Sequence, residues 1–545
     1  MTSLSSTTNT KMKTDILIIG AGPTALGAAS RLIQFQHDNY TIVEARSDPG
    51  GLAYTSKTPE GFLFDMGGHV IFSHYEYFDQ LLDHAVGKGD EFWNVHQRES
   101  HVWMKNRWIP YPFQNNIQAL PVEDQEICLH GIIDAAKNSM KKLEPPKNFD
   151  EWILRVMGEG IADIFMRPYN FKVWAVPTTF MQCRWLGERV ATVDCKKVIS
   201  NVLYKKEEVG WGPNSVFRFP KKGGTGGIWE SVAKIIPKEK FHFGSPVVKI
   251  NVNEKYVVLA SGKTIYYNRM LSTMPLDLLC KMVVEDDENN ENNNNTSVFE
   301  KEKRNVIDDL EHSSSHIIGI GIRGTHTMGK KCWQYFPEDN CPYYRNTIFS
   351  NYAESHTPSE NVKLPTLFKA NGTTNENYYN NDGTVEKKPG PYWSLMFEVS
   401  ESKKFKPVNC GKNKTFNKFH ELPDIVVQCI QGAIKTKLLN EEDEIVSWFH
   451  HRLEHGYPTP SLKRDNALEY LLPKLKSKNI WSRGRFGAWK YEVANQDHSV
   501  MQGVEAINNM LYGTAEMTLN HPSIVNARGK KNVDIVFDLK KNDVV

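Results

Sequence analysis

The sequence is 545 residues long, so two or three domains are expected rather than one core. Hydrophobic residues make up 40% of it, and 66 basic residues against 64 acidic ones leave a net charge of only +2. This balance gives no reason to expect binding to nucleic acid or to a membrane surface, and no apolar run reaches the roughly 18 residues of a membrane span.

The chain begins with a polar stretch, residues 1–14, which we expect to be a disordered tail without a signal sequence. Its eight cysteines form no CxxC pair and show no Cys/His spacing typical of a metal site. We therefore expect reduced thiols, a cytoplasmic location and no metal.

The first predicted elements are a strand, a glycine turn and a helix in DILIIGAGPTALGAASRLI, residues 15–33. Gly20 would make the turn, Gly22 would let a pyrophosphate approach the backbone, and Ala25 holds the third position of the dinucleotide fingerprint. Phosphates would meet the start of the helix, at Pro23 and Thr24. The next predicted strand, TIV, leads into Glu44, which is suited to a ribose hydroxyl.

A second glycine pair, Gly50 and Gly51, follows with Leu52. It suits an extended cofactor that runs past the domain, which favours FAD over NAD. Glycines also open a predicted helix within residues 217–236; this loop could pass close to the same cofactor or simply turn into a surface helix.

The stretch GGHVIFSHY, residues 67–75, places His69 beside a glycine pair. A metal ligand, a general base and a turn residue are all open readings of this histidine. A metal is disfavoured because no partner ligands lie at a suitable spacing.

Further along, residues 120–203 are mostly helical in pattern, and residues 316–398 are rich in β-formers. Two Asn-rich segments, 286–297 and 371–384, are predicted surface loops. The predicted domains are a discontinuous FAD-binding domain (15–110, 210–300 and 480–525), a helical substrate or lid domain (111–209) and an antiparallel-sheet substrate domain (301–479).

Four stretches are dense in aromatic, amide and arginine residues: 108–116, 165–178, 336–352 and 481–503. Together with the fingerprint, they resemble the UDP-galactopyranose mutases of the eukaryotic type, from residue 15 to about residue 520. The resemblance implies an α/β fold, with a Rossmann-like FAD-binding domain, an inserted helical domain and an antiparallel β-sheet domain.

The resemblance also implies an isomerase that interconverts UDP-galactopyranose and UDP-galactofuranose. N5 of reduced FAD would attack the anomeric carbon, UDP would leave and return, and no net redox change would occur. NADPH would supply the initial reduction. No nucleic-acid or membrane partner is expected, and assembly into a homo-oligomer is left open.

Site residues follow from the resemblance in groups. Gly67, Gly68 and His69 would lie against the flavin in a loop that shifts with its oxidation state. Arg485, Asn495 and Gln496 would complete the flavin site. Arg189 and Arg345 would hold the diphosphate, although either alone would more often form a surface ion pair. The remaining substrate contacts would be Phe72, Tyr111, Phe113, Gln114, Asn170, Trp174, Asn214, Trp333, Tyr335, Tyr457, Tyr491 and Asn495.

Some of these assignments compete with structural roles. YPF, residues 111–113, could equally be a proline turn buried in the core. Two rival functions also stay open: a flavin oxidoreductase of the amine-oxidase type, and a non-catalytic protein-binding relative of the GDP dissociation inhibitors.

Overall fold

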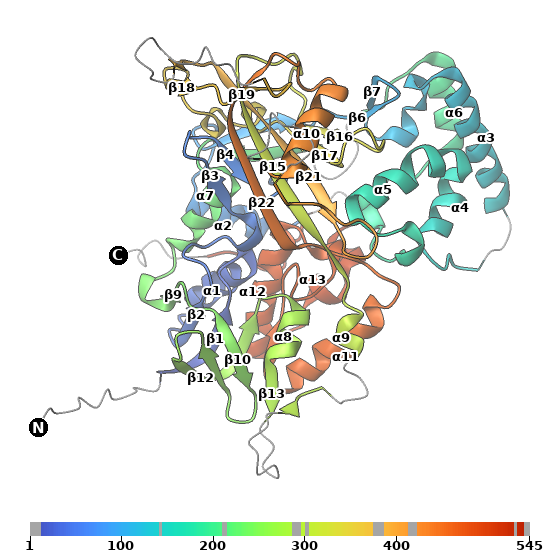
Figure 1. Cartoon of the computed structure of the whole chain (residues 1–545). Helices are drawn as coiled ribbons and strands as arrows, with labels where there is room; N and C mark the ends of the chain where they lie inside the picture. Colours follow the sequence, from blue (N-terminus) through green and yellow to red (C-terminus); the bar gives the residue numbers. More distant parts are fainter. Residues whose placement is uncertain are drawn as a thin grey trace, which may run out of the picture.

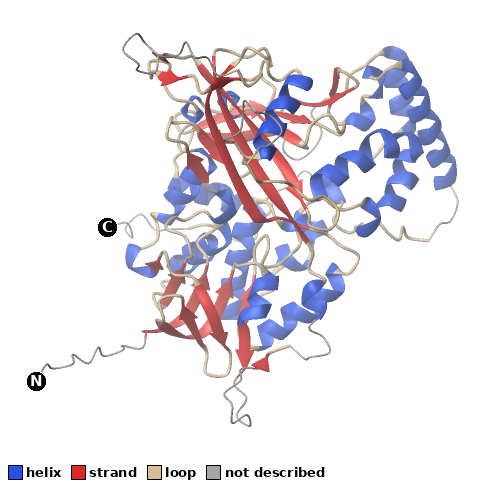
Figure 2. Ribbon diagram, in the orientation of Figure 1, coloured by secondary structure: helices blue, strands red, loops and turns tan. Residues whose placement is uncertain are grey.

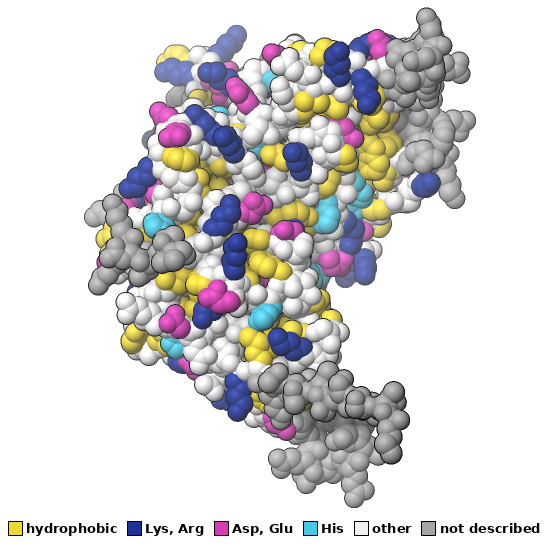
Figure 3. All heavy atoms as spheres, turned by 90° about the vertical axis from the view of Figure 1, so that its left-hand side faces the viewer, with side chains coloured by type: hydrophobic (Ala, Val, Ile, Leu, Met, Phe, Trp, Pro, Cys, Tyr) yellow, Lys and Arg dark blue, Asp and Glu magenta, His cyan; other side chains and the backbone are white. Residues whose placement is uncertain are grey.

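The computed structural model describes residues 12–140, 144–209, 215–285, 296–299, 305–373, 386–412, 422–527 and 531–538. Residues 1–11, Asn214 and most of both Asn-rich loops therefore lie outside the described residues. Two large sheets and a helical lobe make up the chain (Figures 1 and 2). Basic and acidic side chains are interspersed over the face in Figure 3, as the small net charge suggests.

The first sheet is centred on β1 (Met12–Ile19), which includes the last three residues of the predicted tail. β1 runs parallel to β2 (Tyr40–Val43) on one side and to β12 (Thr264–Ser272) on the other. Its four C-terminal residues are buried because helices cover the sheet, which explains the unbroken apolar run ILII. The whole order is β14-β13-β10-β11-β12-β1-β2-β9, and β23 also pairs with β12.

α1 (Pro23–Gln34) packs closely against α12 (Gln496–Tyr512) beside this sheet. A Cβ at Gly503 would come within 1.9 Å of the Thr24 carbonyl oxygen, so only glycine allows the two helices to approach this closely. This contact carries the N-terminal end of α12 to the glycine turn after β1.

The second sheet has the order β19-β22-β15-β21-β17-β16-β6-β7. Its long strands are β15 (His312–Arg323), β21 (Tyr392–Glu401) and β22 (Glu444–Pro458), and its short ones include β16 (Trp333–Tyr335) and β17 (Arg345–Thr347). The pairs are antiparallel except β16 with β6 (Ser100–Met104), which is parallel. The sheet is thus mixed, and it includes residues 100–110, which the sequence assigned to the FAD-binding domain.

A helical lobe lies beside the second sheet (Figure 1) and contains α3 (Val122–Ser139), α4 (Phe149–Ile161), α5 (Arg167–Trp174) and α6 (Cys195–Tyr204). Glycines let α3 and α4 touch: a Cβ at Gly158, where φ is +79°, would lie 2.1 Å from the backbone of Gly131. The Asn148 side chain caps α4 by accepting the N–H of Glu151.

The remaining elements complete the two sheets and cover them. They are the helices α2 (Glu76–Ala85), α7 (Gly224–Ala233), α8 (Leu276–Met282), α9 (Asn305–Asp308), α10 (Asp424–Lys435), α11 (Arg464–Ser477), α13 (Met517–Asn520) and α14 (Pro522–Val525), and the strands β3 (Thr55–Lys57), β4 (Leu63–Asp65), β5 (Trp93–Gln97), β7 (Arg107–Pro110), β8 (Val216–Pro220), β9 (Phe241–His242), β10 (Val247–Asn251), β11 (Tyr256–Leu259), β13 (Val283–Glu285), β14 (Thr296–Ser297), β18 (Leu364–Pro365), β19 (Phe368–Lys369), β20 (Lys387–Lys388) and β23 (Ile480–Ser482).

Among the described residues, none of the helices has the length and apolar character needed to cross a bilayer. All eight cysteines lie in the described ranges, and each is a free thiol.

Glu505 on α12 offers a test of this packing. It is only 3% exposed, and its carboxylate accepts the N–H and the hydroxyl of Thr518 at 2.9 and 2.8 Å. Burial raises its pKa from 4.5 to about 7. The folded protein therefore binds this proton more tightly than the unfolded chain does. The resulting stabilisation is complete below pH 4.5 and is lost as the pH rises through about 7.

Glu505→Gln is expected to change the free energy of unfolding little at pH 5 and to raise it by about 2 kcal/mol at pH 8, because glutamine never becomes charged. Denaturant unfolding at both pH values measures this difference. Glu230→Gln, on the exposed side of α7, should shift stability equally at both. A Glu505→Gln difference that is the same at pH 5 and pH 8 would contradict the prediction.

Candidate active site

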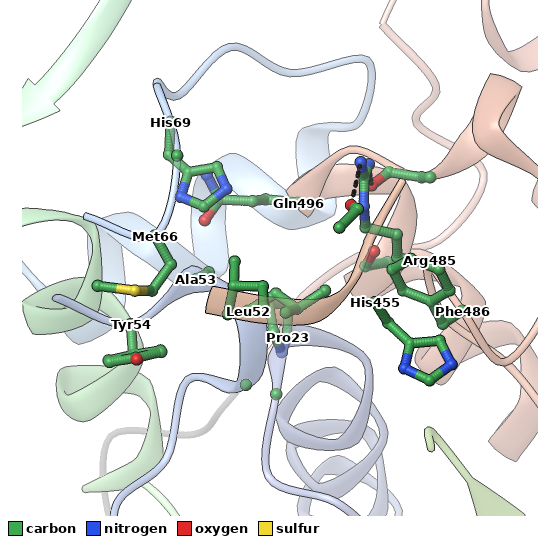
Figure 4. Close-up of a pocket in the computed structure, with 18 of the residues that line it drawn as sticks. Pro23, Leu52, Ala53, Tyr54, Met66, His69, His455, Arg485, Phe486 and Gln496 are labelled. Carbon is green, nitrogen blue, oxygen red and sulfur yellow. Dashed lines mark hydrogen bonds between the residues drawn. The ribbon is translucent and has the colours of Figure 1, made fainter. Parts of the chain in front are cut away.

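A cavity of about 940 Å³ extends from the glycine turn after β1 to the second sheet. The lining comes from segments that are distant in the sequence, including residues 19–24, 51–54, 66–72, 451–457 and 484–499. Figure 4 shows how Pro23 and Leu52 at one part of this cavity face His69, Gln496 and Arg485 at another.

The glycine turns form a cradle at the nucleotide end. Gly20 has φ +103°, and a Cβ there would lie 2.1 Å from Thr273 Oγ1. Gly51 has φ +54°, and its Cβ would lie 3.1 Å from the Cα of Gly22. The two turns thus abut, and a side chain at either position would fill the space beside the start of α1. No side chain caps this helix start, so its N–H groups and the dipole can meet a phosphate.

Glu44 lines the same end of the cavity. Its carboxylate accepts the N–H groups of Ala21 at 2.6 Å and Arg46 at 2.9 Å. It therefore also holds the glycine turn against the end of β2.

The segment predicted to face the flavin crosses the middle of the cavity wall. Gly67 has φ +140°, which favours glycine, and the N–H of Gly68 donates to Glu398 Oε1 at 3.0 Å. Burial lowers the pKa of His69, so its imidazole is neutral near pH 7. Farther along, His74 Nδ1 lies 2.7 Å from Asp497 Oδ2 and anchors the segment to α12.

Arg345 is fixed by a buried carboxylate. Its register on β17 places it opposite Glu398 on β21, and two bonds join them: Nε to Oε1 at 2.7 Å and Nη2 to Oε2 at 2.9 Å. The Tyr344 hydroxyl also donates to Oε2 at 2.7 Å. Glu398 is 2% exposed, and burial alone would raise its pKa. The Arg345 guanidinium and these donors instead hold the pKa of Glu398 below its usual value.

Arg189 reaches the cavity from the helical lobe, at the end of a short 3₁₀ turn. Its guanidinium lies over the Tyr491 ring at 4.7 Å and donates to Asn495 Oδ1 at 3.3 Å. Arg485 lies over the Tyr457 ring at 4.9 Å. The lobe and the second sheet therefore bring Arg189 and Arg345 to one cavity, as the resemblance implies.

Arg98 and Glu398 are two of the cavity residues that the sequence did not predict. Arg98, between β5 and β6, donates from Nη2 to the Tyr335 hydroxyl at 3.1 Å and lies over the rings of Tyr111 and Trp333. The signal for Glu398 was a charged residue inside an otherwise buried strand, which is rare without a partner.

Several predicted site residues do not line the cavity. Phe113 is buried against Phe165, with ring centroids 4.4 Å apart, so the proline-turn reading is correct for it. The side-chain amides of Gln114 and Asn170 donate to backbone carbonyls of Ala191 and Met166 at 2.7 Å each. Trp174 packs edge-on against Tyr457 and Tyr491, which places it behind the site.

Ala25 and Gly50 are likewise absent from the cavity lining; Ala25 is fully buried, while Gly50, with φ +112°, starts the second turn. The glycine loop before α7 also stays away from the cavity. A Cβ at Gly226 would lie 2.5 Å from the backbone of Thr55, so these glycines serve the packing of α7, which is largely buried and not a surface helix.

The other predicted residues line the cavity: Gly20, Gly22, Pro23, Thr24, Glu44, Gly51, Leu52, Gly67, Gly68, His69, Phe72, Tyr111, Arg189, Trp333, Tyr335, Arg345, Tyr457, Arg485, Tyr491, Asn495 and Gln496. Four lining residues have buried polar atoms without a hydrogen-bond partner among the described residues: His69 Nδ1, Arg189 Nε, Ser315 Oγ and Trp333 Nε1. Such atoms normally find a partner, so they indicate a polar ligand. With the glycine cradle, they fit a dinucleotide cofactor and a second polar molecule.

Comparisons with known proteins agree with this geometry. A family described as flavin-containing amine oxidoreductase matches residues 26–315. The crystal structure of a reduced UDP-galactopyranose mutase is 43% identical, covers 95% of this chain and 98% of its own, and has a TM-score of 0.81. A putative protoporphyrinogen oxidase from Exiguobacterium sp. 255-15 (12% identical, TM-score 0.61, covering 92% and 99%) and a putrescine oxidase bound to putrescine (12%, 0.54, 92% and 99%) share the fold.

Proposed function

The chain belongs to the flavin-containing amine oxidoreductases and is a homologue of UDP-galactopyranose mutase, and from this premise we propose that it interconverts UDP-galactopyranose and UDP-galactofuranose. The predictions of a flavoprotein and of an α/β fold with a Rossmann-like FAD-binding part are confirmed. When bound, reduced FAD would supply the nucleophile, its N5, and would end the cycle reduced.

The observation that supports this proposal best is the convergence of arginines in the cavity. A diphosphate that leaves and returns needs cations that stay charged and stay in place, and arginine meets both needs. Arg345 is held by Glu398 on the second sheet, and Arg189 enters from the helical lobe. We assign both to the diphosphate, with Arg98 as a third cation beside Tyr111 and Tyr335.

Tyrosine hydroxyls complete the proposed diphosphate site. Tyr335, Tyr457 and Tyr491 all line the cavity, and their hydroxyls can donate to phosphate oxygens without adding charge. Trp174 supports two of these rings from behind. Of the residues predicted to bind uracil, Tyr111 lines the cavity, whereas Phe113, Gln114, Asn170 and Trp174 do not.

His69 has no acid–base task in this proposal. Its neutral imidazole and the glycines before it would let the segment respond to the flavin through backbone groups. The N–H of Gly68 donates to Glu398, so a movement of this segment would change the hydrogen bonding of the carboxylate that holds Arg345.

The test is a product assay. Anaerobic protein reduced with dithionite should convert UDP-galactofuranose to UDP-galactopyranose without net consumption of reductant. Consumption of an electron acceptor in proportion to an amine substrate would favour the amine-oxidase alternative. Protein that neither carries nor takes up FAD would point to the non-catalytic alternative.

We also propose, on the sequence resemblance alone, that the enzyme is of the eukaryotic type, that NADPH reduces its flavin, and that residues 111–209 act as a substrate lid. From the cysteine pattern we further propose a cytoplasmic location, while assembly into a homo-oligomer stays open.

A further inference from the structure

Two histidines of the second sheet and a cysteine that follows one of its strands lie close together outside the proposed active site. His316 on β15 is fully buried, His450 on β22 is half-buried, and Cys410, in the segment after β21, is exposed. Their donor atoms all lie within 4.8 Å of one another. His451, the next residue on β22, lines the large cavity, and none of the three does. On β15, Ser315 and Ile317 line the cavity; because neighbouring side chains on a strand point to opposite faces, the side chain of His316 between them points away from it.

The separations are close to those around a tetrahedral metal. His316 Nδ1 lies 3.0 Å from His450 Nε2 and 3.7 Å from Cys410 Sγ. Zinc bonds of about 2.0–2.1 Å to nitrogen and about 2.3 Å to sulfur separate tetrahedral ligands by roughly 3.4 Å and roughly 3.5 Å. Small side-chain rotations therefore suffice to place one ion among the three atoms.

A carboxylate behind the cluster orients the buried imidazole. His316 Nε2 lies 3.1 Å from Glu401 Oε2, which also accepts from Arg452 Nε at 2.6 Å. Since a carboxylate accepts, His316 carries its hydrogen on Nε2, and Nδ1 presents a lone pair toward Cys410 and His450. A carboxylate that accepts from a metal-bound histidine in this way is a common outer partner in zinc sites.

We propose that His316, Cys410 and His450 bind a Zn²⁺ ion. Two imidazoles and a thiolate are a donor set that zinc prefers, and the exposed side of Cys410 leaves the fourth position for water. On binding, the thiol loses its proton to solvent, and His450 gives up the hydrogen on Nε2 and carries it on Nδ1. The ion would fasten the segment after β21 to β15 and β22, and its binding does not depend on the isomerase proposal.

Metal content and thiol protection test the proposal in the flavin-loaded full chain. The protein is stripped with a chelator and then titrated with ZnCl₂, while alkylation of Cys410 is followed by peptide mass spectrometry. We expect one zinc per chain and a fall in the Cys410 alkylation rate on the order of tenfold or more, because the bound thiolate is no longer a free nucleophile. Cys195, a half-buried thiol at the start of α6 and not part of the cluster, is the internal control.

Variants at the accessible edge of the cluster complete the test. Cys410→Ser and His450→Gln should each abolish stoichiometric zinc binding, and Glu401→Gln should weaken it by about 10–100-fold. Cys195→Ser should bind zinc as the wild type does. Retention of FAD shows that each variant is folded. Absence of zinc uptake by the wild type, alkylation of Cys410 at an unchanged rate, or uptake that survives the Cys410→Ser and His450→Gln changes together would overturn the proposal.

Discussion

Arg345→Ala is expected to weaken UDP binding by about 3 kcal/mol and to lower turnover with it, because a charge-assisted bidentate contact to a phosphate is lost. The arginine is already positioned by two bonds to Glu398, so little ordering accompanies its contact with the ligand. Calorimetric titration of the reduced enzyme with UDP measures the loss. An unchanged UDP affinity would remove Arg345 from the site.

The same change has a second effect that must be separated from the first. It leaves Glu398 buried without its cation, and breaking a buried pair in this way typically lowers stability by about 3–5 kcal/mol. The double variant Arg345→Met with Glu398→Gln removes both charges. We expect it to recover much of the unfolding free energy but none of the UDP affinity, which would show that the binding defect is not caused by misfolding.

A matched control exists on the same sheet. Arg323 on β15 pairs with Glu444, Nε to Oε2 at 2.8 Å, and neither residue lines the cavity. Arg323→Ala should therefore lower stability without changing UDP affinity. Equal losses of affinity in the Arg323 and Arg345 variants would mean that the effect is indirect.

The parts of the site that the sequence predicts well are local ones. Gly20, Gly22, Glu44 and Gly51 belong to one strand–turn–helix–strand unit and the turn after it, where Gly20 and Gly51 adopt a positive φ that favours glycine. Such requirements are visible in a short stretch of sequence because they depend on neighbours in the chain. All four residues line the nucleotide end of the cavity.

The sequence did not predict the residues whose roles depend on strand pairing. Glu398 meets Arg345 only because β17 and β21 pair in that register, and Arg98 reaches Tyr335 only because β6 lies beside β16. Nothing local in the sequence sets these registers. The same holds for the proposed zinc ligands, since linear spacing could not show that β15 and β22 bring His316 and His450 together.

Aromatic residues show a different limit. Phe113 and Trp174 stand in stretches rich in aromatic residues, and the composition of those stretches cannot say which ring faces the ligand and which faces the core. In this protein both rings are buried: Phe113 packs against Phe165, and Trp174 packs against Tyr457 and Tyr491. The long strand β22 was missed because its histidines, arginine and glutamates obscure the alternation of a half-buried strand.

Gly68→Val is expected to lower kcat on the order of a hundredfold while lowering the free energy of unfolding by only about 1–3 kcal/mol. A Cβ at Gly68 would lie 2.9 Å from both Thr347 Oγ1 and Trp333 Nε1, and 3.2 Å from Glu398 Oε1. The segment must therefore move away from the second sheet. His69 would move with it, and the bond from the Gly68 N–H to Glu398 would break.

Graded variants at Gly68 separate the effect on turnover from the effect on stability. Turnover of the reduced enzyme and denaturant unfolding are measured for Gly68→Ala and Gly68→Val, with FAD content as a check on cofactor binding. Valine carries two methyl groups on the Cβ, which alanine lacks. We therefore expect the step from alanine to valine to lower kcat more strongly than it lowers the free energy of unfolding. Arg345 loses no charge in either variant, so a drop in turnover would come from displacement of the segment and of Glu398. Parallel losses of kcat and of unfolding free energy would instead mean that Gly68 has a purely structural role. The proposed link between the flavin-facing segment and Arg345 would then have no support.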